Sequence, residues 1–388
     1  MLRSTMVASV IAATAGFGSP LMAQMGGGGA ELHMTGLEGP VGLEVDNRAR
    51  AWLSQMGALV APGNGSVSWF YVGQKTLNPF IENYPIAINP NNGEGAGVHH
   101  VTIDNVGNLL LAVGGPPATP QWGGVIQYST IPSVAEAGPY PPCTSAPCGA
   151  PVMNVFPTGS FALGAGGPDT NVYSVAEDPF GNLFVADAGA NMVIKVDTTG
   201  TNSVFATFPS IPNPAGGAAS ESVPTRIIHV PNDGQPGSMA FIMVELTGFP
   251  FIAGNSRIWG IANDGTTSVI VTGATTLVDC ELDTDGTLLV CSAGSFDLNN
   301  GIFSPGTGSI DRVDLTTGAI TQVMGGLWLP TGIEVIDGMI YFCTFYEGSM
   351  YRFDPTPCVV PCPADLDGNG TVDGADLTLF LGSWGVCP

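Results

Sequence analysis

Oxygen-bearing side chains recur at a fixed spacing near the C-terminus, within PADLDGNGTVDGADLTLFLGSWG (363–385). Positions 1, 3, 5, 7, 9 and 12 of a loop in this stretch are Asp365, Asp367, Asn369, Thr371, Asp373 and Asp376. Gly370 stands at position 6, where such a loop turns sharply. Carboxylate, amide and carbonyl oxygens at this spacing suit a hard cation that takes six to eight oxygen ligands. The spacing predicts a calcium-binding loop, so calcium is the expected cofactor; a degenerate loop that binds nothing is the alternative.

A helix is predicted directly after this loop. Leu377, Phe380, Leu381 and Trp384 recur at i, i+3, i+4 and i+7, which gives one apolar face. No entering helix precedes the loop, because a Cys-Pro pair abuts it. A calcium loop without its first helix resembles a dockerin repeat, and the stretch 362–388 is similar to the GC-type dockerin tails of secreted bacterial proteins. The resemblance implies a cohesin-like anchoring partner, although one repeat is present where a usual dockerin has two.

A second group of candidate residues is dispersed through the chain. Its members are Asp187, Glu245, Asp279, Arg226 and His100. Carboxylates, a guanidinium and an imidazole that converge in one place are typical of a functional site. Such a group could hold a metal ion that polarises a carbonyl, with His100 as general base, which is the chemistry of a metal-dependent, lactonase-like hydrolase. The alternative is a hydrogen-bonded lining of a water-filled channel.

One sequence unit recurs six times in the middle of the chain: a short apolar strand, a turn that contains Asp or Gly, and a second apolar strand. The six units begin at Gly42, His100, Ser174, Arg226, Asp279 and Gly332. Several continue into two further apolar runs, so each repeat has about four strands at a spacing of roughly 45–70 residues. The pattern predicts an all-β protein, a six-bladed β-propeller over about residues 32–355. A stacked solenoid is the alternative and fits the alternating strands less well.

The repeats predict which side chains reach the propeller axis. The second strands end at equivalent positions, namely Gln55, Val113, Asp187, Glu245, Ser292 and Thr344. We take these strands as the inner ones, so their ends should form a ring around the channel. The starts of the preceding strands, among them His100, Arg226 and Asp279, should lie near the same face. His99 and His100 are neighbours on one strand and point to opposite faces, so at most one of them belongs to the site.

Three segments of the chain resemble a known family. The stretches 171–200, 222–227 and 244–259 are similar to the ScyD/ScyE family, secreted six-bladed NHL-like propellers associated with synthesis of the pigment scytonemin. The resemblance extends over about residues 165–275, and the insert 114–165 departs from it. It implies a propeller fold and export, and it implies no particular chemistry. Glu38 resembles the first calcium ligand of six-bladed lactonases, but no matching Asn and Asp partners follow.

The N-terminus predicts where the protein works. Residues 1–23 read as a signal peptide, with Arg3 before an apolar run that is too short to span a bilayer. No other stretch is long and apolar enough for a transmembrane helix. We therefore expect a protein that is secreted, either extracellular or in the cell envelope.

Composition narrows the range of partners. The 388 residues include 9 Lys+Arg and 32 Asp+Glu, a formal net charge of −23. An acidic surface repels phosphate, so nucleic acids and anionic membranes are not expected as partners.

The eight cysteines suit an oxidising compartment. Cys143 and Cys148 flank a short loop and are expected to pair, as are Cys362 and Cys387 around the calcium loop. The sequence does not assign partners to Cys280, Cys291, Cys343 and Cys358. Cys291 and Cys343 occupy equivalent positions in neighbouring repeats, so they could pair across blades or serve as small packing residues. A stiff Pro-rich linker (356–362) separates the propeller from the dockerin-like tail (363–388).

Two functions fit these features. The first is a secreted, non-catalytic binding or scaffold propeller that a calcium-binding tail anchors to an extracellular or cell-envelope assembly. The second is a metal-dependent hydrolase that acts at the central channel.

Overall fold

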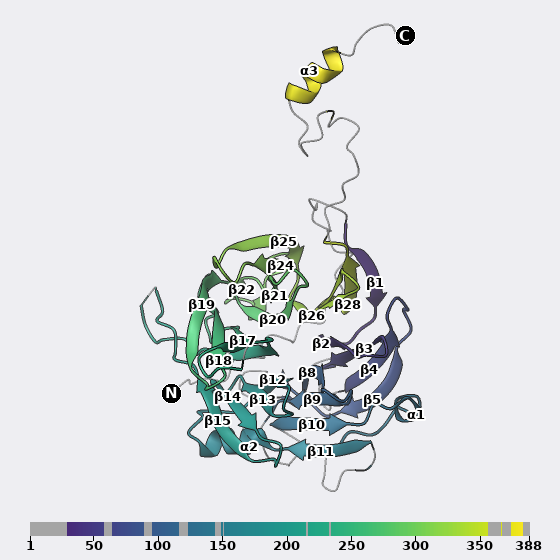
Figure 1. Cartoon of the computed structure of the whole chain (residues 1–388), viewed down its shortest axis with the longest axis vertical. Helices are drawn as coiled ribbons and strands as arrows, with labels where there is room; N and C mark the ends of the chain where they lie inside the picture. The colour runs from purple at the N-terminus through teal and green to yellow at the C-terminus, as the bar shows by residue number, and fades with distance from the viewer. Residues whose placement is uncertain are drawn as a thin grey trace.

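Six four-stranded antiparallel sheets are arranged radially around a common axis (Figure 1). The computed structural model describes residues 29–57, 64–88, 95–115, 123–143, 149, 151–214, 216–232, 234–355, 366 and 374–382. The predicted signal peptide and linker lie outside this set. The structure confirms the predicted all-β, six-bladed propeller.

The first three blades use consecutive strands. The first contains β2 (Pro40–Val45), β3 (Arg50–Gln55), β4 (Gly65–Tyr71) and β5 (Asn78–Tyr84). The second contains β8 (Val98–Ile103), β9 (Leu109–Val113), β10 (Gly124–Tyr128) and β11 (Val152–Phe156). The third contains β12 (Val172–Glu177), β13 (Leu183–Asp187), β14 (Met192–Val196) and β15 (Asn202–Thr207).

The next two blades follow the same order. The fourth contains β16 (Pro224–His229), β17 (Met239–Glu245), β18 (Ser256–Ala262) and β19 (Thr267–Ala274). The fifth contains β20 (Leu277–Leu282), β21 (Leu288–Ser292), β24 (Gly308–Val313) and β25 (Ile320–Leu327). Two short hairpins lie outside the blades: β6 (Ala87–Ile88) with β7 (Gly95–Ala96), and β22 (Phe296–Asp297) with β23 (Ile302–Phe303).

The sixth blade closes the ring with strands from both ends of the described chain. It contains β26 (Pro330–Ile336), β27 (Met339–Thr344), β28 (Ser349–Phe353) and, as its outer strand, β1 (Glu31–Thr35). β1 pairs antiparallel with β28, in a register that places Glu31 opposite Arg352. This pairing joins the N-terminal strand to the last blade and leaves no gap in the circle.

The innermost strand of each blade is the first strand of its repeat, which corrects the sequence-based assignment. β2, β8, β12, β16, β20 and β26 contact one another in sequence around the axis, and β26 returns to β2. The second strands, which were predicted to line the channel, lie one position further out. The apolar pattern could not separate the two, because first and second strands alike are almost wholly buried.

The turns between first and second strands have the predicted chemistry. In DNVGN the Asp104 Oδ1 accepts hydrogen bonds from the N–H groups of Val106 (3.1 Å) and Asn108 (2.7 Å). Gly107 has φ +89°, a left-handed conformation that a side chain would disfavour. The same arrangement recurs at Asp178 and Gly181.

The hydrophobic core lies mainly between neighbouring blades, in clusters such as the one that joins Trp52, Trp69 and Phe80 to the second blade. Cys280, Cys291 and Cys343 are free and buried, so the structure supports packing and not pairing for Cys291 and Cys343. The helices within the described ranges are α1 (Pro132–Ala135), α2 (Thr158–Gly164) and α3 (Gly374–Gly382). Among the described residues, no helix has the length and apolar character needed to cross a bilayer.

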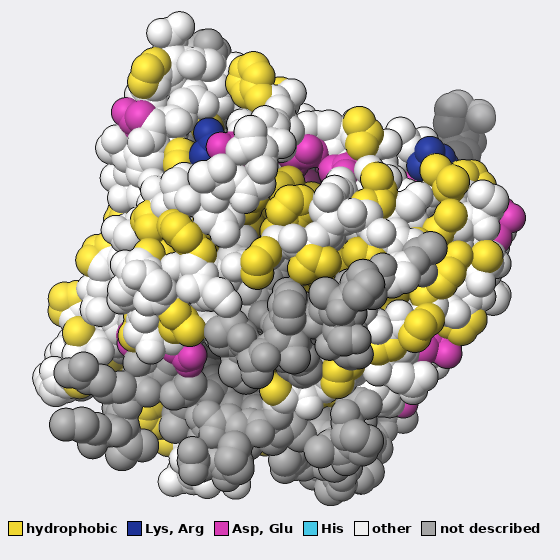
Figure 2. Space-filling view, turned by 90° about the horizontal axis from the view of Figure 1, so that it is seen from below, with side chains coloured by type: hydrophobic (Ala, Val, Ile, Leu, Met, Phe, Trp, Pro, Cys, Tyr) yellow, Lys and Arg dark blue, Asp and Glu magenta, His cyan; other side chains and the backbone are white. Residues whose placement is uncertain are grey.

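The surface has few charged side chains for a protein of this size. Figure 2 shows uncharged polar groups and backbone over much of the described part of one face, with hydrophobic side chains scattered among them. This matches a composition with only 11 % charged residues and 55 glycines.

Candidate functional site

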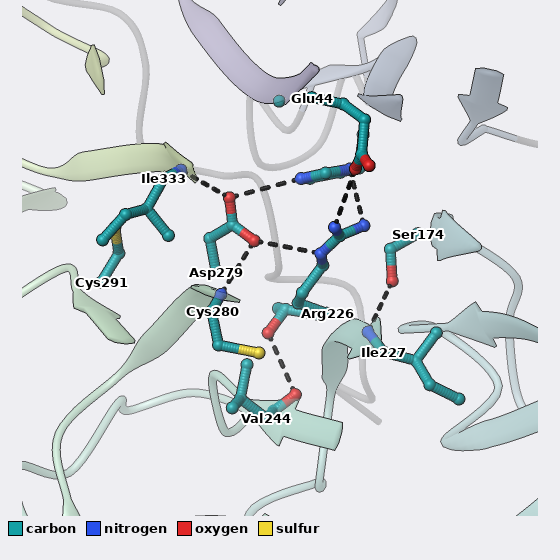
Figure 3. A network of polar contacts seen from close by, with 12 residues as sticks. Glu44, Ser174, Arg226, Ile227, Val244, Asp279, Cys280, Cys291 and Ile333 are labelled. Atoms are coloured by element: carbon teal, nitrogen blue, oxygen red, sulfur yellow. Dashed lines mark hydrogen bonds and ion pairs between the residues drawn. The ribbon is translucent and has the colours of Figure 1, made fainter. Parts of the chain in front are cut away.

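A buried guanidinium lies at the centre of the polar groups near the axis. Arg226, the third residue of β16, is 4 % exposed. Its Nη1 donates to His100 Nδ1 (2.9 Å) and to Thr102 Oγ1 (3.1 Å), both on β8. Its Nη2 donates to Glu44 Oε2 (3.2 Å) on β2, and its Nε lies 3.4 Å from Asp279 Oδ1 on β20. One side chain thus contacts groups from three other blades (Figure 3).

Asp279 is the second centre of this network. Its Oδ2 lies 3.3 Å from His100 Nε2 and accepts a hydrogen bond from Ile333 N (3.0 Å) in the next blade. Its Oδ1 accepts from Cys280 N (2.8 Å) and faces Arg226. His100 lies between the two centres: its Nδ1 faces Arg226 Nη1 and, at 2.5 Å, the carbonyl oxygen of Val101, and its Nε2 faces Asp279. The structure therefore brings His100, Arg226 and Asp279 together, as the sequence predicted.

Three glutamates on consecutive blades surround Arg226. Glu44, Glu281 and Glu334 stand two residues after the equivalent positions Gly42, Asp279 and Gly332, on the same face of their strands. Each of the three glutamates is partly exposed although it belongs to an innermost strand. These glutamates were not among the residues predicted from the sequence, because only the starts of the first strands were aligned. Reading two residues further along each repeat would have found them.

The pKa values of these glutamates reflect their surroundings. Burial raises the pKa of Glu281 to about 8, and the charge of Glu44 adds to the effect. Burial and the charges of Glu281 and Glu44 raise the pKa of Glu334, whose Oε2 is buried without a hydrogen-bond partner. Burial also raises the pKa of Glu44, while Arg226 opposes that shift. Burial alone would lower the pKa of Arg226, but the charges of Asp279 and Glu44 raise it.

Asp187 and Glu245 do not join this group. Both end second strands, β13 and β17, and each is fully buried within its own blade. Asp187 accepts hydrogen bonds from Thr170 Oγ1 (2.6 Å), Asn171 N (2.8 Å) and Ala190 N (3.0 Å), and burial raises its pKa to about 6.

Glu245 is engaged just as fully. It binds Arg257 Nε (2.5 Å) and Trp259 Nε1 (3.0 Å) and accepts a hydrogen bond from Ser222 Oγ. Arg257 and Trp259 belong to β18, the next strand of the same blade, so this carboxylate ties β17 to β18. The predicted convergence of five residues is thus reduced to three, because the second strands are not the inner ones.

The end of the axis where the second strands finish is apolar. In five blades the residue directly after the second strand belongs to one buried cluster: Met56, Ala188, Leu246, Ala293 and Phe345. Val41 and Val278, near the starts of two inner strands, join the same cluster. This cluster draws on five blades at that end, and Glu44 and Glu281 stand three residues beyond Val41 and Val278 on their strands.

His99 faces away from the charged group, as alternation along β8 predicts. Its Nδ1 lies 2.7 Å from the carbonyl oxygen of Val172, and its ring stacks on Tyr173 with centroids 4.6 Å apart. Burial lowers the pKa of His99 to about 4, so it is neutral at ordinary pH. It is the residue of the His99–His100 pair that stays outside the site.

Most of the predicted calcium loop lies outside the described residues. This applies to Asp365, Asp367, Asn369, Thr371 and Asp373, and also to Cys148, Cys358, Cys362 and Cys387. The described part is α3 together with Leu366, whose N–H donates to Asp376 Oδ1 (2.7 Å). Helix α3 occupies the segment in which the exiting helix was predicted, and Leu377, Phe380 and Leu381 on it are exposed. The predicted cysteine pairs stay predictions.

Within the described ranges, no group of three or more His, Cys, Asp or Glu residues is arranged to hold a metal ion. The three glutamates around Arg226 would therefore have to rearrange to bind one.

Comparison with known proteins gives a likeness of fold. No family model matches the chain, and no curated protein matches it. Among solved structures, a structural-genomics protein of unknown function from Bacteroides thetaiotaomicron aligns with TM-score 0.53 and 10 % identity, over 82 % of this chain and 70 % of that one. The chain has a six-bladed propeller fold. The ScyD/ScyE and dockerin resemblances rest on the sequence alone.

Enzymes occur among the more distant matches. A streptogramin B lyase aligns with TM-score 0.43 and 16 % identity, over 83 % of this chain and 96 % of that one. A virginiamycin B lyase from Staphylococcus aureus aligns with TM-score 0.42 and 14 % identity, over 81 % and 94 % of the two chains.

Proposed function

We propose that this protein is a secreted, non-catalytic β-propeller that serves as a binding or scaffold module. Its tail would anchor it, through calcium, to a cohesin-like partner in an extracellular or cell-envelope assembly. The observation that carries the first part is the engagement of the candidate catalytic groups with one another. A general base or a metal ligand must offer a free lone pair to its substrate or ion.

The axial polar groups contribute to closing the ring. Asp279 makes four polar contacts, and Arg226 contacts groups from three other blades. Further inner-strand bonds join neighbouring blades: Thr331 Oγ1 donates to the carbonyl oxygen of Pro40 (2.7 Å), and Ile227 N donates to Ser174 Oγ (3.1 Å). Polar groups that bind one another between the inner strands stabilise the ring of blades.

The anchoring part of the proposal is supported by the tail. All the side-chain ligand positions of the loop carry oxygen donors. The hydrogen bond from Leu366 N, at position 2, to Asp376, at position 12, draws the ends of the loop together. The exposed leucines and phenylalanine of α3 give a partner an apolar surface to cover.

Calcium titration of the full mature chain tests the anchoring part. We expect calcium to bind the wild-type protein and Asp376→Ala to abolish or strongly weaken that binding. Asp264→Ala is the matched control, because it removes an exposed propeller carboxylate and the same charge. Equal calcium affinity in wild type and Asp376→Ala would reject the tail as the calcium site.

A metal-dependent hydrolase at the axis is the second candidate, and the three glutamates favour it. Glu44, Glu281 and Glu334 together with Asp279 outnumber the one guanidinium beside them, so the site would gain from a further cation. A metal ion held there would polarise a substrate carbonyl. Lactone hydrolysis that is lost in Glu281→Gln and Glu334→Gln, with the fold retained, would move this candidate ahead of the binding module.

A further inference from the structure

A continuous strip of aromatic side chains crosses three blades on the face where the second strands end. Its members, which we call the aromatic strip, are Phe249, Phe296, Phe303, Trp328 and Tyr346. The Phe249 and Phe296 rings lie 6.4 Å apart at 84°, and those of Phe296 and Phe303 lie 5.3 Å apart at 74°. Trp328 Nε1 donates to the carbonyl oxygen of Phe303 (2.9 Å), and the rings of Trp328 and Tyr346 lie 4.8 Å apart.

The strip is built from an inserted hairpin and from loops at the ends of the blade strands. Phe296 and Phe303 come from the hairpin β22–β23, which is inserted between two strands of the fifth blade. Phe249 comes from the loop between β17 and β18 of the fourth blade, and it is 48 % exposed. Phe296, Trp328 and Tyr346 are half-buried, so part of each ring meets solvent. Phe303 is 4 % exposed and links the others from within the core, so the rings that reach solvent are those of Phe249, Phe296, Trp328 and Tyr346. Aromatic side chains that reach solvent together on one face are a candidate interaction site.

The loop that carries Phe249 is held firmly. Thr247 and Phe251 have φ values of 75° and 57°, a left-handed region that is rare for a bulky residue. Phe251 is buried, and its N–H donates to the carbonyl oxygen of Gly248 (3.1 Å). Gly248 N in turn donates to Glu221 O (2.8 Å). Backbone strain retained in this way is typical of functional segments, and here it presents one aromatic ring to solvent.

The charges around the strip favour one kind of partner. Aromatic ring faces are electronegative and attract cations. The strip itself includes no Lys or Arg, and Asp297 lies beside Phe296 in the same hairpin. Hydrogen bonds from Asn300 Nδ2 (2.6 Å) and Asn299 N (2.8 Å) lower the pKa of Asp297, so it is ionised at neutral pH. With a net charge of −23, the whole chain attracts cations and repels anions.

Most of the described Lys and Arg side chains form ion pairs elsewhere and do not cover the aromatic strip. Among the described residues, the ion-paired ones are Arg50, Lys75, Arg226, Arg257, Arg312 and Arg352. Of the described residues, Lys195 and Arg257 lie over rings of the third and fourth blades that are not part of the strip.

We propose that the aromatic strip docks a cationic segment of a partner protein, with Lys or Arg side chains over the exposed ring of Phe249 and its neighbours. The proposal rests on the proposed binding function and names the surface and the chemistry of the partner. It does not involve the tail or calcium. The propeller would hold this partner while the tail holds the anchoring one.

A labelled hexa-arginine peptide is the probe, titrated into the full mature chain by fluorescence anisotropy at two salt concentrations. Phe249→Leu keeps the apolar contact and removes the ring. We expect it to weaken peptide binding about two- to fivefold, the effect of one exposed cation–π contact. Phe180→Leu is the matched control, because Phe180 is 80 % exposed on the turn between β12 and β13, away from the strip. It should bind the peptide as the wild type does.

Several results would overturn the proposal. Equal affinity in Phe249→Leu and wild type would mean that the ring face contributes nothing. An equal loss in Phe180→Leu would mean that any exposed aromatic of an acidic protein binds the peptide. Phe249-dependent binding of a neutral oligosaccharide such as cellohexaose, without peptide binding, would assign the strip to a glycan. Phe249-dependent dimerisation in sedimentation would assign it to a second copy of this chain. Asp376→Ala alters only the tail, so it should bind the peptide as the wild type does even if the anchoring proposal fails.

Discussion

Replacing Arg226 by methionine should destabilise the propeller, and more at alkaline than at acidic pH. The substitution keeps much of the side-chain volume and removes the positive charge that Asp279 and Glu44 face at 3.4 and 3.2 Å. Asp279 is 1 % exposed, so water cannot replace the lost partner. Breaking a buried ion pair by removing one member costs about 3–5 kcal/mol.

That cost corresponds to a measurable shift in melting temperature. With an unfolding entropy of about 2 cal/mol/K per residue, a domain of roughly 320 residues loses about 1.5 °C per kcal/mol. Arg226→Met should therefore melt roughly 4–8 °C below the wild type at pH 8. Circular dichroism at the strand minimum, scanned at pH 8 and pH 5, is the assay.

The pH dependence separates charge from packing. Without Arg226 the carboxyl groups around it have raised pKa values in the folded state and bind protons that the unfolded chain releases. A raised pKa favours folding below the unfolded value, and this contribution is lost as pH rises through the folded value. The gap between variant and wild type should therefore be smaller at pH 5 than at pH 8. A loss that is equal at the two pH values, or a shift below 1 °C at pH 8, would refute the charge argument.

Three further predictions concern Glu281, Asp187 and the buried cysteines. The folded-state pKa of Glu281 is about 8 against an ordinary 4.5, so ionising this residue costs stability as pH rises from 4.5 to 8. Glu281→Gln should therefore make the melting temperature less dependent on pH and should raise it at pH 8. A lower melting temperature at pH 8 would contradict this prediction. Asp187→Ala removes the acceptor of two buried donors, Thr170 Oγ1 and Ala190 N, and should cost about 1–3 kcal/mol for each in a denaturant titration while leaving peptide and calcium binding unchanged. Cys280, Cys291 and Cys343 should resist a thiol reagent in the native protein and react in guanidinium; rapid native labelling would show that they are not buried as described.

The number of blades could be read from the sequence, because each repeat carries its own turn signal. Asp104 and Gly107 in one repeat and Asp178 and Gly181 in another bend the chain by local hydrogen bonds and backbone preference. Such features are encoded within a few residues, so a single sequence is enough to find them. The pairing of β1 with β28 is different, because it joins residues some 320 positions apart and no local pattern specifies it.

The candidate site was predictable only in part, because the sequence repeats show which positions are equivalent but not how far each strand lies from the axis. His100, Arg226 and Asp279 stand at matching points of their repeats, so alignment alone brings them together. Asp187 and Glu245 also stand at matching points, but on strands one position further out. Inner and second strands are both buried on two faces, so hydrophobicity does not rank them by distance from the axis. Side-chain partners within a blade, such as Thr170 for Asp187, depend on loop geometry that the sequence does not encode locally.

The calcium content of the chain from Gln24 onward, without the predicted signal peptide, tests the central claim most directly. Elemental analysis after exhaustive exchange would compare the wild type with an Asp365→Ala/Asp376→Ala variant. The proposed anchored binding module predicts one calcium per wild-type chain and none in the variant. One calcium per chain that persists in the variant would contradict it, because the metal would then lie in the propeller and the hydrolase would become the better account.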